Sequence, residues 1–163
     1  GASTLAAAAK GANVTHLDAS KTSVTWARKN LESSGLTDCS VRWIVDDAEK
    51  FLQREYRRNR KYDALIMDPP SFGRGPKGEV WNIETQMTTL LALCKNILSE
   101  SPKFILLTTH SPGISSLSLK NMLIKFLVSP DSGRFQTGDM SIYDTGSGLQ
   151  LPNGFYARFS ANP

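Results

Sequence analysis

The chain has 163 residues and a net charge of +4, and 40% of its residues are hydrophobic while 21% are charged. This length fits a single domain. The composition excludes a disordered chain and a transmembrane chain, because no apolar run approaches the ~20 residues that span a bilayer. Cys39 and Cys94 lie far apart without the spacing of metal ligands, so we expect a reducing, cytoplasmic setting and no metal site. The positive charge permits a nucleic-acid partner but does not require one.

Strand-like and helical segments alternate along the chain. Short apolar runs predict buried strands at 13–18, 41–45, 62–67 and 104–109. Helix-forming residues and apolar residues at helical spacing predict helices at 2–10, 20–35, 51–61, 83–98 and 119–127. Residues 134–143 and 149–159 flank a glycine-rich connection, which predicts an antiparallel hairpin at a sheet edge. This order predicts the α/β class, with a doubly wound, mostly parallel sheet and a C-terminal antiparallel hairpin.

Carboxylates follow three of the predicted strands, at Asp18, at Asp46 with Asp47, and at Asp68. Parallel strands bring such tips to one rim of a sheet, where nucleotide-like ligands bind. Gly1 precedes Asp18 by an interval close to the ~20 residues that separate a glycine loop from the ribose-binding acid in dinucleotide folds. An acid suits a ribose because its oxygens accept from both hydroxyls. The alternative is that these acids cap the helices that follow them.

The segment Asp68–Phe72 reads Asp-Pro-Pro-Ser-Phe and directly follows the predicted strand 62–67. Pro69 and Pro70 have fixed φ angles and no backbone donors, so we expect a stiff turn whose carbonyls are free acceptors. A carboxylate, carbonyl oxygens and an aromatic ring together suit a flat group that bears N–H hydrogens. The alternative is a proline-stiffened loop without a ligand.

This segment resembles the fourth motif of the class I S-adenosylmethionine-dependent methyltransferases, especially of those that modify nucleic-acid bases. The resemblance implies that S-adenosylmethionine is the cofactor. It implies that Gly1 belongs to the end of the glycine turn under the methionine part, and that Asp18 with Ala19 binds the ribose hydroxyls. It also implies that Asp47 binds the adenine amino group while the backbone of Ala48 meets the ring.

The segments 72–75 and 78–81 are most similar to relatives of the large-subunit ribosomal RNA methyltransferases. This similarity implies RNA, and ribosomal RNA in particular, as the substrate. It also implies that residues 1–163 form the catalytic domain, without the family's first strand and the earlier part of its glycine loop. A truncated or degenerate domain that serves as a non-catalytic RNA-binding or assembly module is the alternative. A nucleotide-dependent oxidoreductase would share the sheet but would not explain the Asp-Pro-Pro-x-Phe motif.

The resemblance assigns catalysis to the rim after the strand 62–67, through Asp68, Pro69, Pro70 and Phe72. For a nitrogen target, Asp68 and the Pro69 carbonyl would hold the amino hydrogens, with Asp68 also beside the cofactor. Transfer to carbon 5 of a pyrimidine would need a cysteine thiolate, and we expect both cysteines to be buried bystanders. A nitrogen target is therefore favoured.

Substrate contacts are expected from Phe72, Arg74, Lys77 and His110. Arg74 and Lys77 lie in the glycine-rich segment 73–78, which we expect to be a mobile loop that meets phosphates and closes over the substrate. His110 follows a strand on the same rim, although a lone histidine there is also a common loop hydrogen-bonder. The basic cluster at 54–61 is typical of a solvated helix face.

Overall fold

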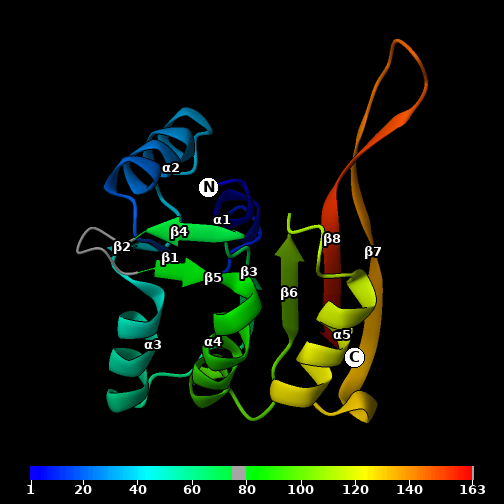
Figure 1. Ribbon diagram of the computed structural model, residues 1–163. Coiled ribbons are helices and arrows are strands. Elements are labelled where there is room, and N and C mark those ends of the chain that lie inside the picture. The colour runs from blue at the N-terminus through cyan, green and yellow to red at the C-terminus, as the bar shows by residue number, and fades with distance from the viewer. Residues whose placement is uncertain (75–79, 163) are drawn as a thin grey trace. The chain divides into compact units, whose positions relative to one another are not determined.

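The computed structural model describes residues 1–74 and 80–162 (Figure 1). The chain divides into two compact units, Gly1–Phe51 and Leu52–Pro163. Within the described ranges, no helix is both long and apolar enough to cross a lipid bilayer.

The first unit contains two helices, two strands and the start of a third helix. These elements are α1 (Ala2–Ala8), β1 (Val14–Asp18), α2 (Lys21–Ser33), β2 (Val41–Val45) and the first residues of α3 (Ala48–Arg57). β1 and β2 pair in parallel, from Val14 opposite Val41 to Asp18 opposite Val45. Both strands therefore end at the same rim of this unit.

Helix α2 forms where the sequence predicts it. The side chain of Ser20 accepts from the Ser23 backbone N–H at 3.2 Å, which satisfies one of the unpaired donors of the first turn. Val24, Ala27 and Leu31 are buried on one face. A Cβ placed on Gly1 would lie 2.6 Å from the Ala27 Cβ, so the start of α1 packs closely against α2.

His16 is a half-buried side chain of β1. Its Nδ1 lies 2.8 Å from the Thr4 hydroxyl, and its ring meets the Trp43 ring at a centroid distance of 5.0 Å. Its Nε2 is buried and has no hydrogen-bond partner among the described residues. Burial lowers the pKa of His16 below its usual 6.5, because the charged ring would lose its hydration.

We expect this buried imidazole to make stability depend on pH. His16 binds a proton near pH 6.5 in the unfolded chain and only at lower pH in the folded chain. Its contribution to the unfolding free energy is therefore complete above pH 6.5 and is lost as the pH falls below that value. The unfolding free energy, measured with denaturant, should fall between pH 7.5 and pH 5.5 in both proteins. The fall should be smaller for His16→Gln than for the wild type. Equal losses in the two proteins would contradict the assignment.

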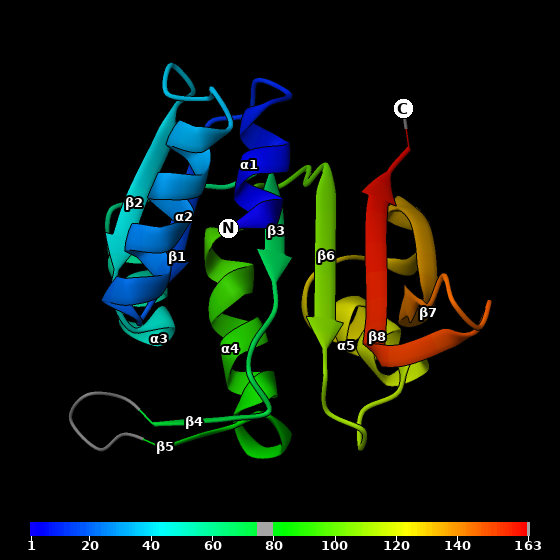
Figure 2. The ribbon, with the colours of Figure 1, turned by 90° about the horizontal axis from the view of Figure 1, so that it is seen from above.

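The second unit contains a four-stranded sheet, a short ribbon and two long helices. Its elements after α3 are β3 (Ala64–Met67), β4 (Phe72–Arg74), β5 (Val80–Asn82), α4 (Ile83–Ile97), β6 (Phe104–Thr109), α5 (Ser116–Phe126), the 3-10 turn Pro130–Ser132, β7 (Gly133–Tyr143) and β8 (Gln150–Ala161). The sheet order is β3-β6-β8-β7, as Figure 2 shows. β3 and β6 are parallel, whereas β8 is antiparallel to both β6 and β7. The predicted α/β class and C-terminal hairpin are confirmed.

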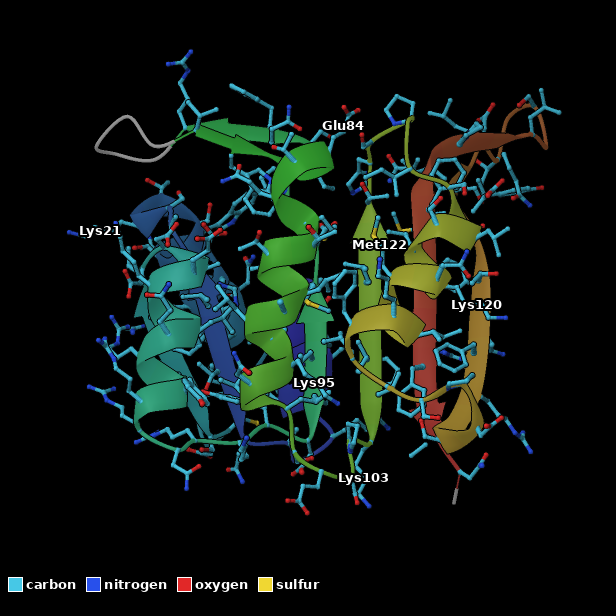
Figure 3. The ribbon with its side chains drawn as sticks, turned by 60° about the horizontal axis from the view of Figure 1, so that its bottom comes forward. Lys21, Glu84, Lys95, Lys103, Lys120 and Met122 are labelled. Carbon is cyan, nitrogen blue, oxygen red and sulfur yellow. The ribbon has the colours of Figure 1, made fainter. Side chains whose placement is uncertain are left out.

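The apolar stripe predicted for 83–98 is the buried face of α4. Ile83, Met87 and Leu91 are almost completely buried, and Cys94 is buried too. The Cys94 sulfur lies 3.7 Å from the sulfur of Met67, which places α4 against β3. α5 lies on the same face of the sheet as α4 (Figure 3). This packing fixes the strand from which Asp68 extends.

The ribbon formed by β4 and β5 was not predicted. We expected a mobile loop over 73–78, but Gly73 and Arg74 pair in an antiparallel ladder opposite Trp81 and Val80. The expectation was wrong for these two residues because paired backbone groups, not glycine content, decide their conformation. The rest of the expected loop, Lys77 included, lies outside the described residues.

Candidate functional site

In the first unit, Asp18 and Asp46 lie side by side at the rim where β1 and β2 end. The Asp46 backbone N–H donates to the Asp18 carbonyl at 3.2 Å. The Asp18 carboxylate accepts from the Ser20 N–H through Oδ1 at 2.7 Å. That bond closes a tight turn before α2 and holds the side chain in place, while Ala19 inside the turn is exposed.

Asp47 is the N-terminal cap of α3. Its Oδ1 accepts from the Lys50 N–H at 3.0 Å, and its own N–H donates to the Asp46 carboxylate at 2.9 Å. The capping role that we kept as an alternative is thus present for Asp47. The exposed Ala48 opens the helix. The cofactor roles of Gly1, Asp47 and Ala48 stay predictions.

In the second unit, Asp68 is fixed by the neighbouring strand. Met67 pairs with Leu107 in the parallel β3–β6 ladder, so Asp68 and Thr108 are neighbours at the strand ends. The Thr108 hydroxyl donates to Asp68 Oδ1 at 2.6 Å, and it also lies 3.3 Å from the Met67 carbonyl. This contact orients the carboxylate and leaves Oδ2 as the oxygen available to a ligand.

His110 lies beside this carboxylate. Its Nδ1 is 2.5 Å from the Asn153 carbonyl of β8, and because a carbonyl can only accept, Nδ1 carries the hydrogen. Its Nε2 lies 3.8 Å from Asp68 Oδ1, so the two form an ion pair when the ring is protonated. Gly154 permits this arrangement, because its φ is +125° and a Cβ there would lie 2.3 Å from the Thr109 carbonyl.

The proline turn differs in one respect from the expected set of free carbonyls. The Trp81 indole N–H donates to the Pro70 carbonyl at 2.6 Å, and the Ile83 N–H donates to the Ser71 carbonyl at 3.1 Å. The expectation was therefore wrong for Pro70 and Ser71, because β5 brings the indole to the first carbonyl and the start of α4 occupies the second. These two bonds tie the turn to β5 and to the start of α4.

Phe72 and Arg74 extend from β4. The Phe72 ring is 56% exposed, which leaves a face open for stacking. The Arg74 guanidinium lies 6.0 Å from the centre of that ring, at the limit of a cation–π contact. Arg74 is exposed, so it can meet a phosphate from the same strand that presents the ring.

Sequence reasoning missed Thr108, Asn153 and Trp81 as partners of this rim. Thr108 had a usable signal, because it lies at the end of a strand predicted to run parallel to β3. The other two depend on the register of β8 and on the β4–β5 ribbon, which no local pattern reveals. Within the described ranges, no cluster of three or more His, Cys, Asp or Glu side chains could hold a metal ion.

Cys94 is unsuited to nucleophilic attack. Burial raises the pKa of its thiol to about 12, so the thiol stays protonated at neutral pH. The other thiol, Cys39, is free of a disulfide and only half-buried, so the expectation of two buried cysteines was wrong for Cys39.

We expect the two thiols to differ sharply in reactivity. Iodoacetamide at pH 8 should alkylate Cys39 in the native protein and Cys94 only after denaturation, because Cys94 is 3% exposed and protonated. Peptide mass mapping of both samples measures this. Alkylation of native Cys94 at the rate of Cys39 would show that α4 opens or that the thiol is ionised.

Comparisons with known proteins relate this chain to methyltransferases, although no family model matches it. The chain is 36% identical to a SAM-dependent methyltransferase from Agrobacterium tumefaciens of known crystal structure, with a TM-score of 0.89 over 99% of this chain and 53% of that chain. It is 30% identical over 154 residues to ribosomal RNA large subunit methyltransferase I of Aeromonas salmonicida, a match that covers 89% of this chain and 36% of the relative. Over 61 residues it is 35% identical to ribosomal RNA large subunit methyltransferase K of Neisseria meningitidis serogroup B.

The chain is much shorter than these relatives. It spans about half of the solved Agrobacterium protein and 36% of the Aeromonas protein. The Neisseria match covers 37% of this chain and 17% of that relative.

Proposed function

We propose that this chain, which belongs to the class I S-adenosylmethionine-dependent methyltransferases and is related to the large-subunit ribosomal RNA methyltransferases, serves methyl transfer to a base in RNA. The observation that carries the proposal is the Asp-Pro-Pro-Ser-Phe turn at the end of β3, with its carboxylate held by Thr108 and its aromatic ring exposed. We assign residues 1–163 to the catalytic domain and the protein to the cytoplasm. The two free cysteines support a reducing compartment.

For the cofactor, we assign the ribose hydroxyls to Asp18, supported at Ala19, and the adenine ring to Asp47 and Ala48. Asp18 suits the ribose because the Ser20 N–H already fixes Oδ1, so the carboxylate is oriented before a ligand arrives. The Gly1 backbone would lie under the methionine part. S-adenosylmethionine supplies the methyl group when it is bound.

For the substrate, we assign positioning of the reacting base to Asp68 and the Pro69 carbonyl. Asp68 Oδ2 and that carbonyl can accept the hydrogens of an amino group and direct its lone pair, while Phe72 stacks on the ring. Pro70 keeps the turn stiff, because its carbonyl is tied to Trp81. The proton that the amine loses on methylation can pass to the Asp68 carboxylate and then to water. We also assign to Asp68 a contact with the cofactor.

We infer a nitrogen target rather than carbon 5 of a pyrimidine. The carbon reaction requires a thiolate, and the pKa of buried Cys94 is about 12. The region after β6 carries His110 and Ser111, with no cysteine. Arg74, Lys77 and His110 would bind the substrate, which we take to be ribosomal RNA.

Two measurements on the same protein test the proposal. Calorimetry with S-adenosylmethionine should show binding, and labelled cofactor incubated with unmodified ribosomal RNA should transfer its methyl group to a nucleoside identified by mass spectrometry. A methyl group on carbon 5 would refute the nitrogen target. RNA binding without cofactor binding would instead support the non-catalytic module.

A further inference from the structure

The exposed face of α2 carries a groove that no step of the proposed reaction uses. It is shallow and open to solvent, and it is lined by Lys21, Thr22, Thr25, Trp26 and Lys29, which together we call the α2 groove. The opposite face of the helix, with Val24 and Ala27, is buried in the first unit. The groove residues therefore contribute little to the core.

Trp26 dominates the α2 groove. Its side chain is 68% exposed, an unusual position for an indole because most of its apolar surface stays in water. An exposed indole offers a flat π face on which any nucleobase can stack. Thr25 donates its hydroxyl to the Lys21 carbonyl at 2.8 Å, so this hydroxyl is turned to the helix backbone and leaves the ring open.

The charge of the α2 groove is of one sign. Lys21 and Lys29 lie at its two ends, about 12 Å apart along the axis at a rise of 1.5 Å per residue. Figure 3 shows Lys21 pointing away from its helix. Among the residues that the structure describes, no acidic side chain lines the groove. A span of about 12 Å matches roughly three nucleotides of a stacked strand, so both lysines can meet phosphates of one strand.

We propose that the α2 groove binds an unpaired strand of RNA, with one base stacked on Trp26 and flanking phosphates held by Lys21 and Lys29. This inference rests on the proposed function, because it takes RNA as the substrate class and adds a second place of contact. Lys21 is three residues beyond Asp18, so the groove starts at the rim of the first unit that we assign to the cofactor ribose. A protein partner fits less well, because Trp26 is the only apolar side chain of the described part of the chain that lines the groove.

Binding of a uridine-only oligonucleotide, followed by fluorescence anisotropy at several salt concentrations, tests the α2 groove. Trp26→Ala should weaken binding about fivefold or more, through loss of stacking. The pair Lys21→Ala and Lys29→Ala should reduce the slope of log K against log salt by about 0.7 for each lysine. Tyr56→Ala is the matched control, because Tyr56 is an exposed aromatic residue beside Arg57 on α3, outside the groove. This variant should bind like the wild type.

The possible outcomes distinguish a failure of the α2 groove proposal from a failure of the proposed function. With saturating RNA, Trp26→Ala should keep wild-type turnover and cofactor affinity and change only the KM for RNA. If Trp26→Ala binds RNA as tightly as the parent and unfolds at the same temperature, the α2 groove does not bind RNA, and the proposed function stays intact. An equal loss in Tyr56→Ala would also overturn the α2 groove proposal. A wild-type protein that binds cofactor but no RNA would overturn both the groove and the RNA substrate.

Discussion

Asp68→Ala abolishes methyl transfer and leaves cofactor affinity within a few-fold of the parent; this is the largest effect that we expect from a single substitution. In the proposed reaction Asp68 holds the hydrogens of the reacting amine, and loss of one such preorganised polar contact costs about 10²- to 10³-fold in turnover. The proposal gives the cofactor further contacts, at Asp18 and Asp47, so its affinity should depend only weakly on Asp68. Single-turnover methyl transfer and calorimetric cofactor binding, measured on the same preparation, decide the matter.

Three further variants test whether the Asp68 result is specific. Asp63→Ala changes an exposed acid just before β3, at the other end of the strand from Asp68, and should keep full turnover. Thr108→Val removes the hydroxyl that donates to Asp68 at 2.6 Å and should lower turnover less than Asp68→Ala, whereas Thr108→Ser should restore it. If Asp68→Ala loses cofactor binding in step with activity, Asp68 belongs to the cofactor site and the division of roles is wrong.

The elements that carry the site were predictable because their signals are local. The buried face of α4 follows from apolar residues at helical spacing, and the Ser20 cap marks the start of α2. A short apolar run followed by Asp68 is enough to place a carboxylate at a strand end. The position of Asp68 could therefore be predicted from the sequence, before its partners were known.

The partners could not be predicted in the same way because they depend on pairing between distant segments. Thr108 lies 40 residues from Asp68 in sequence, and their contact follows from the β3–β6 register alone. The β4–β5 ribbon has only three residues in each strand, too few for a period of two to be recognised. The indole bond from Trp81 to Pro70 depends on that ribbon, so it was missed along with it.

The second large effect is expected in the first unit, where Asp18→Ala should weaken cofactor binding without a direct effect on the chemical step. A carboxylate that accepts from two ribose hydroxyls makes two charge-assisted hydrogen bonds, and their loss costs about 2–4 kcal/mol of binding free energy. Calorimetric titration with S-adenosylmethionine measures this loss, and turnover at saturating cofactor should stay close to that of the parent.

Asp18 also accepts from the Ser20 N–H at 2.7 Å, so the alanine variant could weaken cofactor binding by loosening the turn before α2. Asp18→Asn distinguishes loss of the ribose contact from loosening of the turn. Its amide oxygen can still accept from the Ser20 N–H, while the negative charge is lost. If the ribose assignment is correct, Asp18→Asn keeps the thermal stability of the parent and loses a large part of the cofactor affinity. Asp38→Ala, an exposed acid before β2, should bind like the parent. An Asp18→Asn protein with parental affinity would mean that Asp18 serves only as a turn residue.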